Sequence, residues 1–479
     1  MKRSALVAAL GVATTLVSAP TTARADDESP SAPSASSVLS LEQVLQSVDQ
    51  SFPLLIAAAR EQEEARGAAL SADGGFDPSL KASGVYEPIS GYPRQYFTVQ
   101  ADQPTPLWGT SFFAGYRYGS GKFPIYDGKL DTNDYGEVRG GARIPLWRDG
   151  PIDRRRASVR QAELGVTLAK LSVDQARIEA RRLASLRYWD WVAAGRKIKI
   201  LDAWLELAVV RDTALAARAS RGDIPEIDRT ENQRTILQRQ AAVVAAERDL
   251  IQAAQELSLF MRGADRAPLV VPKERLPTSL PAAGPTDVRG GATEEERAVA
   301  RRPDVKRFEL SRDRSRIEAD LARNQQKPAI DLTLYGARQF GPGDPVRGEP
   351  VIGAALVLDI PILNRVQNGR EQSAEASASR NDAQRSFARD RVIADVRNSV
   401  ASIEAAQKRA AMAEAEARVA ATLADAELKR FDLGESTLLL VNLREQASAE
   451  AKVREVDALA DYHRAIASYR AATARDLGP

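Results

Sequence analysis

Few side chains in this sequence could carry out covalent or metal chemistry. The 479 residues include no cysteine and a single histidine, His463. Disulfides, thiolate metal sites and a cysteine nucleophile are therefore excluded, and one histidine does not support a Ser/His/Asp set. We interpret His463 as a packing or solvated residue, not a metal ligand. The sequence thus predicts no catalytic residue, no metal site and no cofactor, and an enzyme is disfavoured.

One short stretch has the residue types of a phosphate-binding loop. Gly119-Ser120-Gly121-Lys122 resembles part of that motif. However, Tyr116 stands five residues before Gly121 where the motif requires glycine, and Phe123 follows the lysine where it requires serine or threonine. No apolar buried strand precedes it either. A nucleotide site is therefore not predicted.

Two further clusters have a structural and a functional interpretation. Tyr188-Trp189-Asp190-Trp191 falls inside a helical pattern, where aromatic packing between helices is favoured over a ligand site. Arg154-Arg155-Arg156 stands at the start of a helical pattern. The simplest interpretation is a solvated helix start, and the alternative is a position near anionic lipid or a partner.

The N-terminus has the features of an export signal. Lys2-Arg3 precedes an apolar run from about residue 5 to 19, and Ala23-Arg24-Ala25 is a small-residue cleavage site. We expect a signal peptide over 1–25 and a disordered Ser/Pro/Ala-rich tether over 26–37. No later stretch has about 18 consecutive apolar residues, so a membrane-spanning segment would have to be a strand. The net charge of +2 does not indicate nucleic acid.

Two long helical hairpins organise the chain. Apolar residues recur at steps of three and four over 151–262, and Gly222 marks the turn between the two arms. A second hairpin over 364–475 turns at Gly434. At about 1.5 Å per residue, the roughly 70 residues of the first arm could reach about 100 Å, more than a compact core needs.

The hairpins belong to a duplicated pattern. Ile144-Pro145-Leu146-Trp147 and Ile360-Pro361-Ile362-Leu363 open the two copies, and Pro145 and Pro361 are 216 residues apart, close to the 212 that separate the two turn glycines. We expect repeat 1 over 38–262, an irregular connection over 263–302, and repeat 2 over 303–479, each with a helix, strands and a hairpin.

Strands are predicted over about 79–146 and 329–361, where the period changes to two. Phe97, Val99 and Ala101 alternate with polar residues, as do the apolar residues of 138–144. This alternation is typical of an outer-membrane barrel and also of a half-buried soluble sheet. Residues 105–109 could make an extra turn, giving four strands in the first segment instead of two. Aromatic residues that favour an interfacial girdle are Tyr92, Tyr96, Trp108, Phe112, Phe113, Tyr116, Tyr118, Tyr126 and Tyr135.

In this order of elements the sequence resembles the TolC family of outer membrane channel proteins. The resemblance covers nearly the whole mature chain and rests on Leu41-Glu42-Gln43-Val44-Leu45 before Pro53, on Phe76-Asp77-Pro78, on the two strand-to-helix junctions, and on the paired turn glycines. It implies a mixed α and transmembrane β fold. Three chains would each give four strands to a twelve-strand β-barrel, which continues as an α-helical barrel across the periplasm.

The resemblance also implies functional residues. The hairpin tips would dock a periplasmic adaptor protein, and they map to Arg221, Gly222, Asp223, Leu433, Gly434, Glu435 and Ser436. A periplasmic gate would lie beside them, with Asp228, Leu440 and Leu443. A leucine-lined constriction would close by excluding water. Many members carry a lipidated cysteine at the mature N-terminus, which this chain lacks.

The expected function is a passive exit duct. It would serve a tripartite efflux pump or a type I secretion system, with an adaptor and an inner-membrane transporter as partners, and would sit in outer membrane lipid. Two alternatives are a periplasmic adaptor, which needs only one hairpin, and a soluble coiled-coil structural protein of the cell envelope, which does not explain the aromatic-rich strands.

Overall fold

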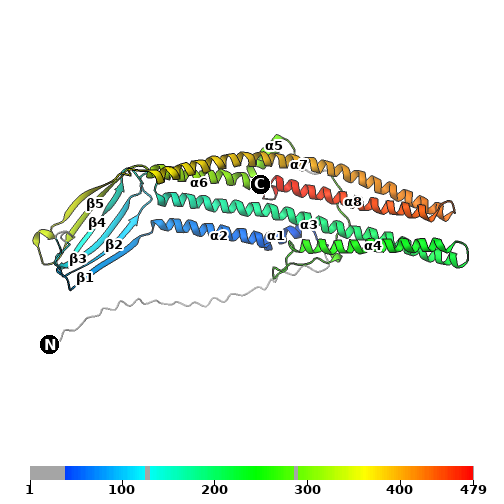
Figure 1. Cartoon of the computed structure of the whole chain (residues 1–479), viewed down its shortest axis with the longest axis horizontal. Coiled ribbons are helices and arrows are strands. Elements are labelled where there is room, and N and C mark those ends of the chain that lie inside the picture. The colour runs from blue at the N-terminus through cyan, green and yellow to red at the C-terminus, as the bar shows by residue number, and fades with distance from the viewer. Residues whose placement is uncertain (1–37, 125–129, 285–287, 289, 478–479) are drawn as a thin grey trace, which may run out of the picture.

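The structure, a computed structural model, describes residues 38–124, 130–284, 288 and 290–477. The expected export signal (1–25), the tether (26–37) and Tyr126 lie outside these residues. The described chain is elongated, with a β-sheet at one end and long helices that run away from it side by side (Figure 1).

Six antiparallel strands form one sheet in the order of the chain. They are β1 (Ser79–Glu87), β2 (Arg94–Pro104), β3 (Ser111–Gly121), β4 (Glu137–Pro145), β5 (Ala329–Gln339) and β6 (Val351–Asp359). β4 pairs with β5 from Glu137–Gln339 to Pro145–Asp331, so the two predicted strand segments meet in the middle of the sheet.

The expectation of four strands per chain is wrong. The first segment forms four strands because a tight turn separates β2 from β3. Thr105 N donates to Thr110 O (2.9 Å), and Thr110 N donates to Leu107 O (2.9 Å). Trp108 and Gly109 adopt left-handed φ values of 51° and 69°. An alternating pattern that runs through such a turn does not reveal how many strands it contains.

Two shorter helices lead into the sheet. Ser40 caps α1 (Leu41–Ser51) in a capping box with Gln43, and α2 (Pro53–Asp73) begins at Pro53. A short 3₁₀ turn, η1 (Gly74–Phe76), ends this run just before β1. In the second half α6 (Pro303–Gln325) leads into β5.

Two helical hairpins make up most of the molecule's length. The first joins α3 (Arg154–Ser220) to α4 (Glu226–Ser258), and the second joins α7 (Arg365–Asp432) to α8 (Leu438–Ala472). α1, α2 and α4 pack along α3, while α6 and α8 pack along α7 (Figure 1). The 67 residues of α3 make it about 100 Å long. No helix in the described part of the chain is both long and apolar enough to cross a bilayer.

The largest buried cluster lies near the middle of the helices. Tyr188, Trp189 and Trp191 are buried there between α3, α1 and the end of α4, so aromatic packing explains this motif. His463 of α8 stacks on Trp189 with ring centroids 4.1 Å apart, and its Nε2 lies 2.9 Å from Pro281 O. The histidine is therefore a packing residue.

The connection over 263–302 is more ordered than expected. It contains a short 3₁₀ turn, η3 (Lys273–Arg275), and a helix, α5 (Ala292–Arg301), which packs on α7. Glu295 of α5 pairs with Arg397 (2.9 Å), and Glu294 pairs with Arg475 (3.1 Å). This ten-residue helix was not recognised in the sequence because the residues around it are rich in proline and glycine.

Candidate functional site

The sheet has one polar face and one apolar face. On the polar face the registered row Gln100, Gly115 and Arg139 crosses three strands. Arg139 reaches past Gly115, which has no side chain, and donates to Gln100 Oε1 (2.9 Å). Further cross-strand ion pairs tie this face together. They are Arg117–Glu137 (2.8 Å), Arg94–Glu87 (2.9 Å) and Lys81–Asp102 (3.3 Å).

The opposite face is apolar and exposed. It carries Phe97, Val99 and Ala101 of β2 and Val138 of β4, as the alternation predicts, and Ile352 of β6 is 91% exposed. Its other members include Leu80, Ala82, Phe112, Ala114, Ala142, Ile144, Ile330, Leu332, Leu334, Ala354, Leu356 and Leu358. A continuous apolar surface of this extent is unusual for a soluble monomer and typical of a lipid-facing barrel wall.

Exposed aromatic side chains stand at both ends of the apolar face. Trp108 and Trp147 lie toward the helices, whereas Tyr86, Tyr92 and Tyr135 lie toward the strand-connecting loops at the far end. Two aromatic bands that bracket an apolar zone match the pattern of residues at the two interfaces of a bilayer.

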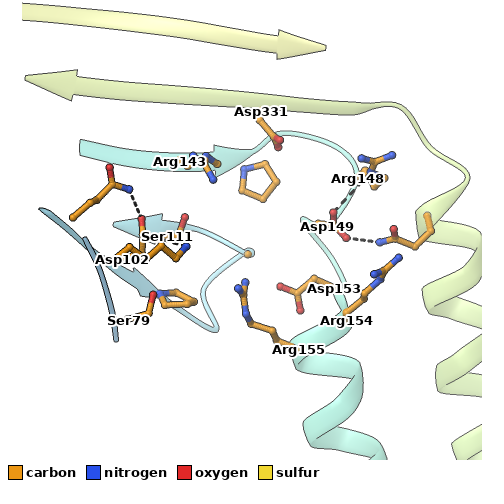
Figure 2. A pocket seen from close by; sticks show the side chains of 16 residues that line it. Ser79, Asp102, Ser111, Arg143, Arg148, Asp149, Asp153, Arg154, Arg155 and Asp331 are labelled. Atoms are coloured by element: carbon orange, nitrogen blue, oxygen red, sulfur yellow. Dashed lines mark hydrogen bonds and ion pairs between the residues drawn. The ribbon is translucent and has the colours of Figure 1, made fainter. Parts of the chain in front are cut away.

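A cavity of about 720 Å³ lies where the polar face meets the helices. Figure 2 shows side chains from the strands and from the start of α3 gathered around it. Five basic and four acidic residues line it, so it does not select strongly for either sign of charge. The charged residues are Lys81, Arg143, Arg148, Arg154, Arg155, Asp102, Asp149, Asp153 and Asp331.

Asp149 holds this junction together. Its backbone N donates to Asn324 Oδ1 (2.8 Å) at the end of α6, and its carbonyl accepts from Arg156 Nη2. Asp153 caps α3 by accepting from Arg156 N (2.8 Å). A Cβ on Gly109 would lie only 2.5 Å from Asp149 O, so the β2–β3 turn must present glycine here. Burial raises the pKa of the Asp149 carboxyl, and the hydrogen bond from Gln325 opposes that rise.

The predicted arginine cluster divides between these roles. Arg156 braces the junction from within, whereas Arg154 and Arg155 line the cavity (Figure 2). Gly119 and Gly121 of the rejected phosphate-loop pattern belong to strand β3. Gly119 N donates to Thr132 Oγ1, and Gly119 O accepts from Thr132 N, so the backbone groups of Gly119 are already used in the connection that follows β3.

The two hairpin tips have the same backbone geometry. Gly222 and Gly434 have φ values of 81° and 79°. In the first tip Asp223 N donates to Arg218 O (3.0 Å), and in the second Glu435 N donates to Arg430 O (2.8 Å). This Schellman arrangement satisfies the last carbonyls of each outgoing helix. In the second tip Ser436 Oγ bonds to Glu427.

The residues expected at the gate lie just beyond these tips. Asp228 is in the first turn of α4. Leu440 and Leu443 of α8 are 43% and 53% exposed, whereas Leu438 and Val441 are buried within the second hairpin. The leucine-rich stretch therefore has an inward half that packs the hairpin and an outward half that is free for another contact.

A buried charge cluster that the sequence analysis missed joins the two hairpins. Glu445 of α8 accepts from Arg239 Nη2 of α4 (2.8 Å) and from Arg211 of α3. Arg211 also donates to Asn442 Oδ1 (2.9 Å). The guanidinium of Arg239 lies 4.5 Å from the Trp204 ring centroid, and its side chain is fully buried.

Within this inter-hairpin cluster, the pKa of Arg239 depends on its partner Glu445. Burial lowers the pKa of Arg239, while the hydrogen bond and charge of Glu445 oppose that effect. Arg239 stands in the buried stripe of α4 between Thr235 and Val243. A charged residue at such a position is the signal that could have identified the cluster from the sequence.

Comparisons with known proteins agree with this geometry. Residues 296–475 match the family model for outer membrane efflux protein. The outer membrane channel CmeC of Campylobacter jejuni is similar at a TM-score of 0.66 and 13% identity, covering 91% of this chain and 85% of that one. The outer membrane protein VceC of Vibrio cholerae gives 0.64 and 17%, covering 91% and 96%. No curated protein matches the sequence.

Proposed function

We infer that this chain is an outer membrane efflux channel, which passes its cargo without making or breaking bonds. The observation that carries this conclusion is the two-faced sheet. Its apolar face carries exposed apolar side chains on every strand, and its opposite face is lined by ion pairs and opens on a charged cavity. A closed barrel of such sheets would face lipid on the outside and water inside. The helices then extend into the periplasm, as the resemblance predicted.

Three copies of the chain form the channel in this proposal. The hairpins line up around a common axis and continue the barrel as a helical tunnel, and the two structural repeats of each chain supply equivalent parts of its wall. The similar lengths of α3 and α7, 67 and 68 residues, support this arrangement because both hairpins then reach the same depth.

The hairpin tips dock a periplasmic adaptor protein, which connects the channel to an inner-membrane transporter. Exposed apolar side chains beside both tips support this assignment: Leu433 is 75% and Ile227 69% exposed. Docking opens the channel because the adaptor binds the open arrangement of hairpins better than the closed one. The inter-hairpin cluster of Arg211, Arg239 and Glu445 favours one arrangement until the adaptor is bound.

Leu440 and Leu443 form the periplasmic constriction, with Asp228 nearby. Because an apolar constriction excludes water, carboxylates in place of these leucines should keep it hydrated and conducting. The test is ion conductance of the purified channel in a planar bilayer. The double variant Leu440→Asp, Leu443→Asp should pass several-fold more current than the unmodified channel.

Ile251→Asp provides the matched control, since Ile251 is 62% exposed but lies far from the tips near the other end of α4. Its current should equal that of the unmodified channel. If neither the unmodified protein nor the double variant conducts, the channel function is refuted. If the unmodified channel conducts and the two leucine replacements do not change its conductance, only the gate assignment is refuted. No observation favours the adaptor or the structural-protein alternative.

A further inference from the structure

The described sheet has two more strands than the resemblance implies, and they are built into it along their full length. β2 pairs with β3 from Arg94–Gly121 to Pro104–Ser111, which is the longest ladder in the sheet. On the polar face Arg139 of β4 reaches across β3 to Gln100 of β2. Detaching β1 and β2 from the sheet would break this ladder and leave its backbone groups without partners.

The added strands are also fixed at the helical end. The β2–β3 turn packs against the connection between β4 and α3, where Gly109 lies against Asp149 and Pro145, and where the Trp108 ring lies against Gly150. Thr105 Oγ1 donates to Thr110 O (2.7 Å) and closes the turn. A hairpin that was only appended to the edge of the sheet would not need these contacts. We therefore take the β2–β3 turn as part of the structure that supports the sheet.

The two edge strands match each other. β1 and β6 each have nine residues, and both carry the sheet's apolar face, with Leu80 and Ala82 on one and Leu356 and Leu358 on the other. Both strands are exposed along most of their length on both faces, unlike β2 to β5. Their outward backbone groups have no strand partner within the described chain. In lipid such an edge must be paired.

We propose that β1 of one copy pairs with β6 of the next and that three copies close an eighteen-strand barrel. Six strands is an even number, so β1 and β6 run in opposite directions and closure keeps every neighbour antiparallel, as outer membrane barrels require. This inference rests on the trimer of the proposed function and replaces the twelve strands that the resemblance implies.

The wider barrel changes what the outer membrane segment can pass. Because barrel diameter grows roughly linearly with strand number, eighteen strands give about 1.5 times the diameter of twelve. The helical hairpins per chain are unchanged, so the barrel becomes wider relative to the tunnel beneath it. The cavity at the sheet–helix junction (Figure 2) would lie where this width changes.

Cysteine cross-linking in the full-length oligomer tests the closure directly, because the chain has no cysteine of its own. Ser83→Cys in β1 is combined in turn with Gly353→Cys, Ala355→Cys and Val357→Cys in β6, and a short bis-maleimide is added. All four positions share the polar face. At least one combination should give a covalent ladder that ends at three chains, with a native mass of three chains.

The comparison pair is Phe113→Cys in β3 with Ala355→Cys. Within one sheet these strands are separated by β4 and β5, so about 14 Å lies between them and the short linker does not span it. A twelve-strand trimer would instead bring β3 of one chain beside β6 of the next, and this pair would cross-link. That result, or a native mass of two chains, or no cross-link from any β1–β6 pair, would overturn the proposal.

Polymer exclusion gives a second measurement. Deleting residues 94–121 removes β2 and β3 and lets β1 pair with β4, which leaves four strands per chain. Polyethylene glycols added on the outer side should enter the unmodified barrel at sizes that the deletion variant excludes. Equal exclusion limits would count against the wider barrel. If the unmodified oligomer fails to conduct, or if the unmodified protein is recovered as a soluble periplasmic protein, the channel function itself is refuted. Failure of the wider barrel and failure of the channel function can therefore be told apart.

Discussion

Single residues decide how firmly the two hairpins are joined. Glu445 is the only acidic partner that the described structure gives to Arg239, and it also pairs with Arg211. Glu445→Gln should therefore leave two buried guanidinium groups without a compensating charge, at a cost of about 3–5 kcal/mol. We expect a lower thermal unfolding midpoint by circular dichroism and a larger open fraction in bilayer recordings.

Asp249→Asn provides the control, because its pair with Arg248 is exposed and should contribute no more than about 1 kcal/mol. A variant that replaces Arg211, Arg239 and Glu445 together by Met, Met and Leu should recover the midpoint, since no buried charge is left. If Glu445→Gln and Asp249→Asn lowered the midpoint equally, the cluster would not hold the hairpins.

His463 gives the helices a dependence on pH. Burial against Trp189 lowers the pKa of this imidazole below its usual value near 6.5, and the hydrogen bond to Pro281 O opposes the shift. The unfolded chain therefore takes up a proton at a higher pH than the folded chain does. The stability contributed by neutral His463 is complete above pH 6.5 and is lost as the pH falls below that value.

Unfolding midpoints at pH 7.5 and 5.5 test this dependence. The unmodified protein should lose more stability between these values than His463→Gln, which keeps a donor near Pro281 but does not titrate. Equal losses in the two proteins would show that other groups cause the acid sensitivity.

The type of a residue alone predicted its role less well than its type together with its position in a helix. The aromatic stretch at 188–191 was correctly assigned to packing, because large apolar side chains inside a helix seldom do anything else. Arg239 was missed, since one arginine among 67 basic residues does not stand out until the buried stripe of α4 is known.

At the scale of elements, the tips depend on two glycines in a left-handed conformation. A Cβ at Gly434 would meet nothing within 4 Å, so substitution is penalised by backbone strain and not by a clash. Gly434→Val should cost about 1–2 kcal/mol locally and distort the tip. We expect reduced export of a fluorescent efflux substrate by cells that make equal amounts of channel.

Gly165→Val is the control for this prediction. Gly165 lies inside α3 with ordinary helical geometry and also has open space around its Cβ position. Export should be unaffected there, because valine suits a helix slightly better than glycine. Normal export by the Gly434 variant would contradict the assignment of the tip to adaptor docking.

Elements were predicted well where one signal repeats over many residues. Both hairpins and their turn glycines follow from the helical period and from local backbone chemistry. The number of strands stayed open: an extra turn at 105–109 was one of two alternatives, and the left-handed Trp108 on which this turn depends has no characteristic sequence signal that would decide between them. The helix α5 is held by tertiary ion pairs, which a local pattern does not contain.

For the whole molecule, the apolar face of the sheet determines where the protein resides. Leu334 stands in the middle of β5 on that face, and its neighbour Thr333 points to the polar face. An arginine at a lipid-facing position near the bilayer midplane costs about 2–4 kcal/mol, whereas the same residue facing the water-filled interior costs little. Leu334→Arg should therefore reduce the amount of assembled oligomer in outer membrane fractions several-fold.

Thr333→Arg supplies the matched control, because it places the same charge one residue away in the same strand. The new arginine would lie opposite Arg143, but both guanidinium groups would face water, which screens their repulsion, so Thr333→Arg should assemble far better than Leu334→Arg. If the two variants assembled equally well, the apolar face would not contact lipid. If Thr333→Arg were the more damaging, the two faces of the sheet would have to be exchanged, and with them the assignment of interior and exterior for the whole barrel.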